Sequence, residues 1–264
     1  MIPKSGHRFS DQIMPERKDF MDTPQLSAED IQARVLHRDG LMLVIDKPAG
    51  LPVHRGPKGG ANLEDSFDAL RFGLPRPPVL AHRLDRDTSG CLVLGRHRKA
   101  TASLGLLFKH GKIGKTYWAV VEGSPAQDEG EIDIPLGRLD AERGWWQKPD
   151  PNGLPSKSRW TVMGRGDGLT WLALEPVTGR THQLRVHCAA MGFPIVGDNI
   201  YGNGPRFGEP SLHLHSREIV VPLSKNKPPV RVVAPVPDHL HERLRACGWN
   251  GEDILAPEQV ASHV

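Results

Sequence analysis

Short apolar runs bounded by glycine, proline or charged residues recur along the chain, and this pattern predicts β-strands. The clearest runs are LMLVIDKP (41–48), CLVLGR (91–96), KTYWAVVEG (115–123) and LTWLALEPV (169–177). Weaker runs predict further strands at 79–82, 131–137, 158–165, 213–223 and 230–235. Between the first two clear runs, glycines and prolines interrupt 49–61 every few residues, which predicts a loop.

Amphipathic spacing predicts three helices, at 99–110, 181–191 and 237–247. The second ends before Gly192 and the third before Gly248, and glycine is favoured just past a helix C-terminus. Strands outnumber helices and mostly follow one another directly. We therefore expect an α+β fold with a mixed, largely antiparallel central sheet and flanking helices.

The pattern divides the 264-residue chain into three parts. Residues 1–30 alternate polar, charged and proline residues without a period, so we expect a flexible leader or arm. The patterned region, 31–250, is predicted to form one domain, and 251–264 a C-terminal tail. The sequence contains no internal repeat of fixed period.

Composition excludes several classes of protein. With 38% hydrophobic and 25% charged residues, the chain is typical of globular proteins, and its 28 glycines and 24 prolines favour a turn-rich, sheet-rich fold. No window approaches the roughly 18 apolar residues that a membrane span needs, and the start lacks a secretory signal, so we expect a cytoplasmic protein. No GxGxxG or GxxxxGK[ST] motif is present, which disfavours dinucleotide and nucleoside-triphosphate enzymes.

The net charge of +3 is small, but its distribution is uneven. The stretch from Arg83 to Lys115 contains eight basic and two acidic residues. The stretch from Arg143 to Arg185 contains seven basic and three acidic residues. Such stretches are either solvated faces or the surface of a protein that contacts phosphates, as nucleic-acid-binding proteins do.

The segment AHRLDRDTSG (81–90) is the strongest candidate for chemistry, because it places charged and hydroxyl side chains in a loop between apolar strands. An aspartate beside arginines stays ionised even when partly buried. Asp85 and Asp87 are therefore a structural turn, a single catalytic carboxylate, or the carboxylate pair of a glycosidase. His82 to Asp85 is similar in outline to the protein-kinase catalytic loop, but the other kinase motifs are absent.

The cysteines, histidines and tryptophans are the candidates for metal binding and for stacking contacts with RNA. The three cysteines are too scattered for a disulfide framework or a CxxC site, and no set of histidines and cysteines has zinc spacing, so these histidines are expected to be structural. Trp160 and Trp171 lie in predicted strands and are expected in the core, whereas Trp145 and Trp146 are candidates for stacking on RNA bases.

HRLDRDTSG (82–90) resembles the catalytic loop of the RluA-type RNA pseudouridine synthases, which isomerise uridine to pseudouridine within RNA. Three further segments resemble motifs of that family in the same order: DKPAGLPVH (46–54), KTYWAVVEG (115–123) and GRTHQLRVHCAAMGFPIVGDNIYG (179–202). The resemblance covers about residue 36 to Trp249, although the match around 157–160 is loose. The family often carries a small RNA-binding domain ahead of the catalytic one, which the leader is too short to form.

The resemblance implies a role for individual residues. Asp85 matches the catalytic aspartate, Tyr117 the tyrosine that stacks on the target base, and Arg180 the arginine that pairs with the aspartate. Arg83 matches a residue that enters the RNA helix where the target base leaves it. The other residues predicted to bind substrate are Arg86, Lys115, His182 and Arg185. The expected partner is a structured ribosomal or transfer RNA stem-loop, and the expected state is a monomer.

The chemistry of this reaction agrees with that assignment. Isomerising uridine changes no oxidation state and hydrolyses nothing, so no cofactor or metal is expected, and one shielded carboxylate can act as nucleophile or base. Two alternatives come from other classes: a non-catalytic RNA or ribosome binder, and a hydrolytic N-glycosidase. A pure binder has no use for a buried carboxylate facing RNA, and a glycosidase would release free uracil.

Overall fold

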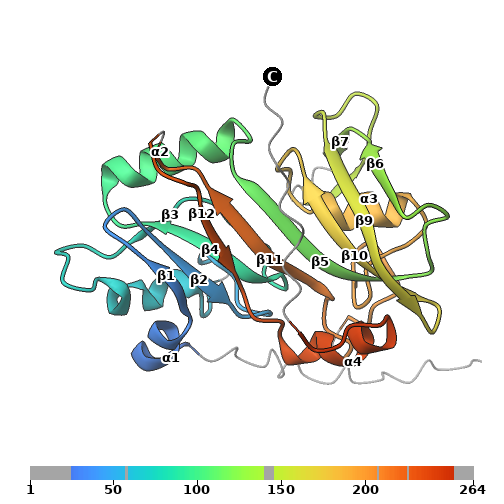
Figure 1. The fold of residues 1–264 in the computed structure, drawn as a ribbon, viewed down its shortest axis with the longest axis horizontal. Coiled ribbons are helices and arrows are strands. Elements are labelled where there is room, and N and C mark those ends of the chain that lie inside the picture. The colour runs from blue at the N-terminus through green and yellow to red at the C-terminus, as the bar shows by residue number, and fades with distance from the viewer. Residues whose placement is uncertain (1–24, 57–58, 140–145, 207, 225, 253–264) are drawn as a thin grey trace, which may run out of the picture.

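A single mixed sheet forms the centre of the molecule (Figure 1). The structure is a computed structural model and describes residues 25–56, 59–139, 146–206, 208–224 and 226–252. Within these residues the sheet has ten strands, and its main path runs β1-β2-β4-β11-β5-β10-β9-β6, with β3 on β4 and β12 on β11. The strand bounds are β1 Val35–Arg38, β2 Met42–Lys47, β3 Val79–Leu80, β4 Ser89–Gly95, β5 Gly114–Glu122, β6 Glu129–Asp133, β9 Lys157–Gly166, β10 Leu169–Pro176, β11 Leu214–Val221 and β12 Val230–Val233.

The predicted α+β class and largely antiparallel sheet are confirmed. Every pairing in the sheet is antiparallel except that of β4 with β11. The run predicted as one strand at 131–137 is two, because β6 ends at Asp133 and Pro135, which has no N–H for a ladder, precedes β7 (Leu136–Arg138). β7 pairs with β8 (Gln147–Pro149) in a separate hairpin.

The alternation of side chains divides the core between the two faces of the sheet. In β4, Leu92 and Leu94 pack on one face, and Cys91 and Val93 on the other. β5 follows the same rule: Ala119 and Val121 belong to a different cluster from Trp118 and Val120. The predicted core positions of Trp160 and Trp171 are confirmed, with 4% and 1% of each residue exposed.

The three predicted helices are confirmed to within two residues at each end, as α2 (Arg98–Lys109), α3 (Gln183–Ala190) and α4 (Asp238–Ala246). Four short elements escaped prediction: the helix α1 (Ala28–Ala33), the 3-10 helix η1 (Leu63–Leu70), and the strands β1 and β8. None of the helices described is long and apolar enough to cross a membrane.

The boundary expected at residue 30 is corrected, because it falls inside α1. Ser27 and Asp30 form a reciprocal capping box at the start of this helix, and Ile31 is fully buried. A capped helix with a buried anchor therefore begins within the segment predicted as a leader. Residues 1–24 of that segment, and 253–264 of the predicted tail, lie outside the described residues.

Candidate active site

The loop that carries Asp85 joins β3 to β4, and its backbone is held by hydrogen bonds from the side chain of Lys47. Lys47 is fully buried, and its Nζ donates to the carbonyl oxygens of Pro48, Arg86 and Thr88, each at 2.8 Å. Burial lowers the pKa of Lys47 to about 7, against the raising effect of Asp87, Asp85 and Asp46. Three carbonyl acceptors require three N–H donors, which only the ammonium form has. Lys47 thus fixes the backbone on the C-terminal side of Asp85.

The end of the loop is set by the parallel pairing of β4 with β11. Gly90 has φ +102°, and a Cβ atom there would lie 2.2 Å from the carbonyl oxygen of Ser216. Ser89 Oγ and His215 Nδ1 are 2.8 Å apart in the same buried layer. Glycine is required here because the two backbones approach too closely for any side chain.

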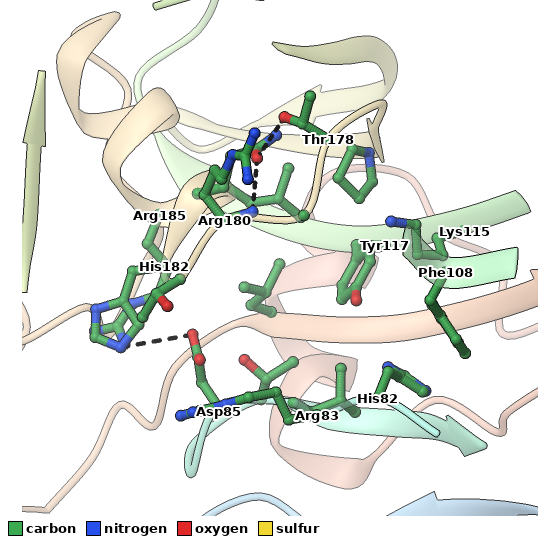
Figure 2. A pocket seen from close by; sticks show the side chains of 18 of the residues that line it. His82, Arg83, Asp85, Phe108, Lys115, Tyr117, Thr178, Arg180, His182 and Arg185 are labelled. Carbon is green, nitrogen blue, oxygen red and sulfur yellow. Dashed lines mark hydrogen bonds and ion pairs between the residues drawn. The ribbon is translucent and has the colours of Figure 1, made fainter. Parts of the chain in front are cut away.

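Asp85 lines a cavity of about 400 Å³ that opens between the loop, β5 and the start of α3 (Figure 2). Its walls carry both apolar and cationic side chains. They come from the loop, from α2, from β5, from the segment that leads into α3 and from α3 itself. Among them are His82, Arg83, Asp85, Phe108, Lys115, Tyr117, Arg180, His182 and Arg185. The structure therefore brings the sequence-predicted residues to one place, except Arg86.

His182 is the partner that the structure gives Asp85. Its Nε2 lies 3.7 Å from Asp85 Oδ2, and the two side chains are 6% and 20% exposed. His182 has a left-handed backbone, φ +54°, immediately before α3. Burial lowers the pKa of His182, against the raising effect of the Asp85 charge. The imidazole is therefore held neutral beside a carboxylate.

The expected pairing of Arg180 with Asp85 is not what the structure shows. Arg180 Nε donates to the carbonyl oxygen of Pro155 at 3.2 Å, and its backbone N–H donates to Gln183 Oε1. Figure 2 shows its guanidinium on the far side of the cavity from Asp85. The sequence motif contains a second arginine, Arg185, within the first turn of α3, and position along the motif does not distinguish the two.

That second arginine, Arg185, is electrostatically coupled to Asp85. It is 3% exposed and forms a bidentate pair with the fully buried Asp198, at 2.8 and 2.7 Å. Burial lowers the pKa of Arg185, but the hydrogen bonds and charge of Asp198, together with the charge of Asp85, raise it by more. The net shift of the Arg185 pKa is therefore upward. Arg185 is thus a fixed cation beneath the cavity.

Tyr117 presents its ring to the cavity from the middle of β5 (Figure 2). It packs at the junction of two core clusters, one built around β10 and α3 and the other around β2, β4 and η1. Burial raises the pKa of its phenol, so the hydroxyl is neutral near pH 7. The position suits an aromatic platform for a flat ring.

The end of the cavity away from His182 holds a cation and a stacked pair of rings. His82 stacks on Phe108 with ring centroids 4.2 Å apart, and its Nε2 accepts the backbone N–H of Val93. Burial, followed by the charge of Lys115, lowers the pKa of His82 to about 3. Lys115 itself has its pKa lowered by burial.

A second and larger open depression, of about 960 Å³, adjoins the cavity and shares Asp85 with it. Arg83 is exposed and lines both. Arg86 lines only the open depression and donates from Nε to the carbonyl oxygen of Gly50. Asp87 also faces the open depression and is not among the residues that line the cavity beside Tyr117. Both loop carboxylates therefore line the open depression, and of the two only Asp85 also lines the cavity beside Tyr117.

The remaining candidates from the sequence are the histidines considered for metal binding and the tryptophans considered for RNA stacking. His187 contacts Ser158 Oγ and the Ile134 carbonyl oxygen, and His213 the Ser211 carbonyl oxygen, so these histidines are structural. Across the described ranges, no three His, Cys, Asp or Glu side chains are arranged to hold a metal ion. Trp146 lines the open depression, and Trp145 lies outside the described residues.

Sequence reasoning missed three residues that organise the site: Lys47, Asp198 and Tyr201. All three lie within the motifs DKPAGLPVH and GRTHQLRVHCAAMGFPIVGDNIYG, so the motifs were a signal, but their individual roles depend on contacts between distant segments. Asp198 holds Arg185, and Tyr201 Oη lies 2.8 Å from His182 Nδ1.

Comparison with known proteins identifies relatives of this arrangement. Residues 41–190 match the family model described as RNA pseudouridylate synthase. The chain is 43% identical over 208 residues to an uncharacterized RNA pseudouridine synthase of Zymomonas mobilis, covering 77% of this chain and 94% of the relative. It is 35% identical to ribosomal large subunit pseudouridine synthase C of Vibrio cholerae, covering 80% and 68%. Among solved structures, human RNA pseudouridylate synthase domain containing 4 matches with a TM-score of 0.69 at 28% identity, covering 83% and 95%.

Proposed function

The chain belongs to the RNA pseudouridine synthases, a family of isomerases, and from this premise we propose that Asp85 catalyses isomerisation of specific uridines in ribosomal or transfer RNA. The observation that carries the proposal is the cavity in which Asp85 lies with Tyr117, His182 and Arg185. One carboxylate, an aromatic ring and a buried cation are the groups that this reaction needs.

The reaction exchanges one glycosidic bond for another. The N1–C1′ bond of uridine breaks, the uracil turns, and a C5–C1′ bond forms. The hydrogen on C5 is released as a proton, and N1 acquires one, so atoms and electrons balance without a redox partner. An ionised Asp85 supplies an electron pair, either to C1′ as a nucleophile or to a proton as a base.

The surrounding residues have separate tasks in this proposal. Tyr117 stacks on the uracil and retains it while the glycosidic bond is broken. Arg185 stabilises negative charge that develops near the cavity floor, because Asp198 holds its guanidinium in place.

The RNA backbone would lie in the open depression. Arg83 and Arg86 line it together with Arg55 and Arg206, an arrangement suited to phosphate contacts. Similarity to a large-subunit ribosomal RNA enzyme supports ribosomal RNA as one substrate class. The target uridine must leave the helix to reach Asp85, at a cost of about a few kcal/mol that is smallest in loops.

Comparing pseudouridines in total RNA from cells with and without the gene tests this proposal. Sites that disappear on deletion should return with the wild-type gene and with Asp87→Asn, but not with Asp85→Asn, which keeps the size of the side chain and removes its charge. Purified Asp85→Asn should still bind the same RNA.

Three outcomes would contradict the proposal. Unchanged pseudouridine sites after deletion, with RNA binding retained, would favour a non-catalytic binder. Release of free uracil, with equal loss of that activity in Asp85→Asn and Asp87→Asn, would favour a glycosidase. Full activity of Asp85→Asn would remove Asp85 from the chemistry.

A further inference from the structure

A chain of polar contacts reaches Asp85 from outside the cavity. The backbone N–H of Gln147, in β8, donates to the hydroxyl oxygen of Tyr201 at 2.9 Å. That hydroxyl lies 2.8 Å from His182 Nδ1, and His182 Nε2 lies 3.7 Å from Asp85 Oδ2. These polar contacts connect the β7–β8 hairpin to the loop between β3 and β4 through the side chains of Tyr201 and His182.

The first of these contacts has a fixed direction. An amide N–H can only donate, so the Tyr201 oxygen is an acceptor towards Gln147. The hydroxyl hydrogen remains available for His182 Nδ1, but the oxygen has a second lone pair that can accept from an Nδ1–H, so this contact alone fits both tautomers. The Asp85 carboxylate, 3.7 Å from Nε2, favours a proton on Nε2, and because a neutral imidazole has one N–H, Nδ1 then accepts from the Tyr201 hydroxyl.

Tyr201 is itself held firmly. Its backbone N–H donates to Asp198 Oδ1 at 3.0 Å, and the guanidinium carbon of Arg185 lies 5.3 Å from the centre of its ring. The His182 ring meets it edge-on, with centroids 5.5 Å apart. The left-handed backbone of His182 is uncommon for a non-glycine residue, and such strain persists where surrounding contacts determine it.

We propose that Tyr201 is a positioning residue for catalysis: its hydroxyl holds His182 as the Nε2–H tautomer, which directs one N–H at Asp85 Oδ2 and leaves the other carboxylate oxygen for the substrate. This inference rests on the proposed function, because it gives Asp85 the catalytic role. A protonated His182 would pair with Asp85 as a full cation and make the carboxylate a weaker nucleophile and base. Tyr201 opposes that protonation by occupying Nδ1.

The charged and titratable groups that act on His182 come from three segments. Asp85 and Arg83 belong to the catalytic loop, Arg185 to α3, and Asp198 and Tyr201 to the segment after it. Asp85 and Asp198 favour the imidazolium, whereas burial, Arg185 and Arg83 oppose it. Removing the Tyr201 hydroxyl leaves these groups in place, so its effect can be measured separately.

Tyr201→Phe tests the proposal, since it keeps the ring on Arg185 and removes only the hydroxyl. The measured quantity is the single-turnover release of tritium from [5-³H]uridine in a transcript of the RNA region whose pseudouridine depends on the gene. We expect about a five- to tenfold slower rate, the effect of one hydrogen bond, with RNA affinity unchanged. We also expect the acid limb of the pH profile to move to higher pH, because Nδ1 protonates more easily without its donor.

The matched control is Thr170→Val in β10. Thr170 is fully buried and donates to the Gly123 carbonyl oxygen at 2.7 Å. This variant loses one buried hydroxyl, as Tyr201→Phe does, and should lower thermal stability without slowing turnover or moving the pH profile. An equal loss of rate in both variants would show that Tyr201 acts only through stability and would overturn the inference.

A second measurement needs no RNA. In protein labelled with ¹⁵N-histidine, the signal of His182, assigned by its absence in His182→Gln, should show an unprotonated Nδ1 and a protonated Nε2 in wild type and a mixture in Tyr201→Phe. The opposite tautomer in wild type would overturn the inference, as would a Tyr201→Phe rate and pH profile equal to wild type. Full activity of Asp85→Asn would instead refute the proposed function, so the two failures are distinguishable.

Discussion

At the scale of single residues, Tyr117 offers the simplest test of how uracil is held. Its ring faces the cavity from β5, and its hydroxyl shares a hydrogen bond with Ser216. Tyr117→Phe keeps the stacking surface, so we expect turnover within about threefold of wild type, whereas Tyr117→Leu should lose about 1 to 3 kcal/mol of stacking. Single-turnover rates at saturating and subsaturating RNA separate binding from chemistry. Equal rates in the two variants would show that the ring is not a platform.

The two arginines of the GRTHQLR segment give a second prediction at this scale. Arg185→Lys loses the bidentate hydrogen bonding to Asp198. Removing one partner of a buried ion pair lowers the free energy of unfolding by about 3 to 5 kcal/mol, and the loss is smaller when one bond survives, as it can with lysine. Arg180→Lys loses only the contact with the Pro155 carbonyl oxygen.

We therefore expect Arg185→Lys to lower both turnover and thermal stability, and to do so more than Arg180→Lys. Rates and unfolding temperatures of the two variants check this ranking. If Arg180→Lys is the slower enzyme while both remain folded, Arg180 must turn towards Asp85 when RNA is bound.

At the scale of elements, the parallel pair β4–β11 carries the end of the loop that contains Asp85. Gly90→Ala would place a Cβ atom 2.2 Å from the Ser216 carbonyl oxygen in addition to forcing a side chain to φ +102°. The strands must separate, so we expect about 3 kcal/mol or more of lost stability and a severe loss of turnover.

Gly168→Ala is the control for Gly90→Ala. Gly168 also has a positive φ, +72°, but nothing lies within 4 Å of a Cβ built there. It should lose only about 1 kcal/mol and keep its activity. Denaturant unfolding and turnover of both variants give the comparison, and similar losses would mean that strand contact at Gly90 is unimportant.

At the scale of the whole molecule, buried histidines determine the response to acid. His215 and His213 are fully buried, and burial lowers the pKa of His215 to about 3 and of His213 to about 4. In the unfolded chain these histidines have the ordinary pKa of about 6.5 and bind protons below it, whereas in the folded protein they stay neutral down to their lowered pKa values. The free energy of unfolding therefore falls as the pH decreases from about 6.5 towards those lower values.

We expect the free energy of unfolding to fall by on the order of 5 kcal/mol between pH 7 and pH 4 from these two groups. Denaturant titrations at a series of pH values measure the slope. His215→Gln should flatten it, whereas His110→Gln, at the exposed end of α2, should not. An unchanged slope in His215→Gln would contradict the prediction.

RNA binding is the other property of the whole molecule. Arg83 is exposed at the border of the cavity and the open depression, where a flipped nucleotide would leave its stack. Arg83→Ala should slow turnover on a stem-loop by about tenfold and on a short unstructured fragment much less, because only the stem-loop has a gap to fill.

The matched variant is Arg76→Ala, whose arginine is exposed but lines neither cavity. Binding of all three proteins should weaken steeply with salt, since phosphate contacts release counterions. An Arg83→Ala defect of the same size on both RNAs would argue against a role in flipping.

The sequence by itself determined the elements and the family of this protein. Strand periodicity in runs such as KTYWAVVEG and the glycines after two helices are local signals, and they located the main strands and three helices within a few residues. Local signals also concentrated charge and hydroxyls in 82–90 and led to Asp85. The weak points were short elements such as α1 and η1, which have too few residues to show a period.

Only the tertiary structure decided which side chains meet. Asp85, Tyr117 and His182 come from separate segments and line one cavity, beside which Tyr201 contacts His182, and the order β4-β11-β5 places the loop that carries Asp85 near β5. Arg180 and Arg185 are equally basic in the sequence, yet one bonds to a carbonyl oxygen and the other is buried against Asp198. The physical reason is that the energies that select a partner, burial, hydrogen-bond geometry and the local dielectric, depend on distances in space, which residue spacing along the chain does not contain.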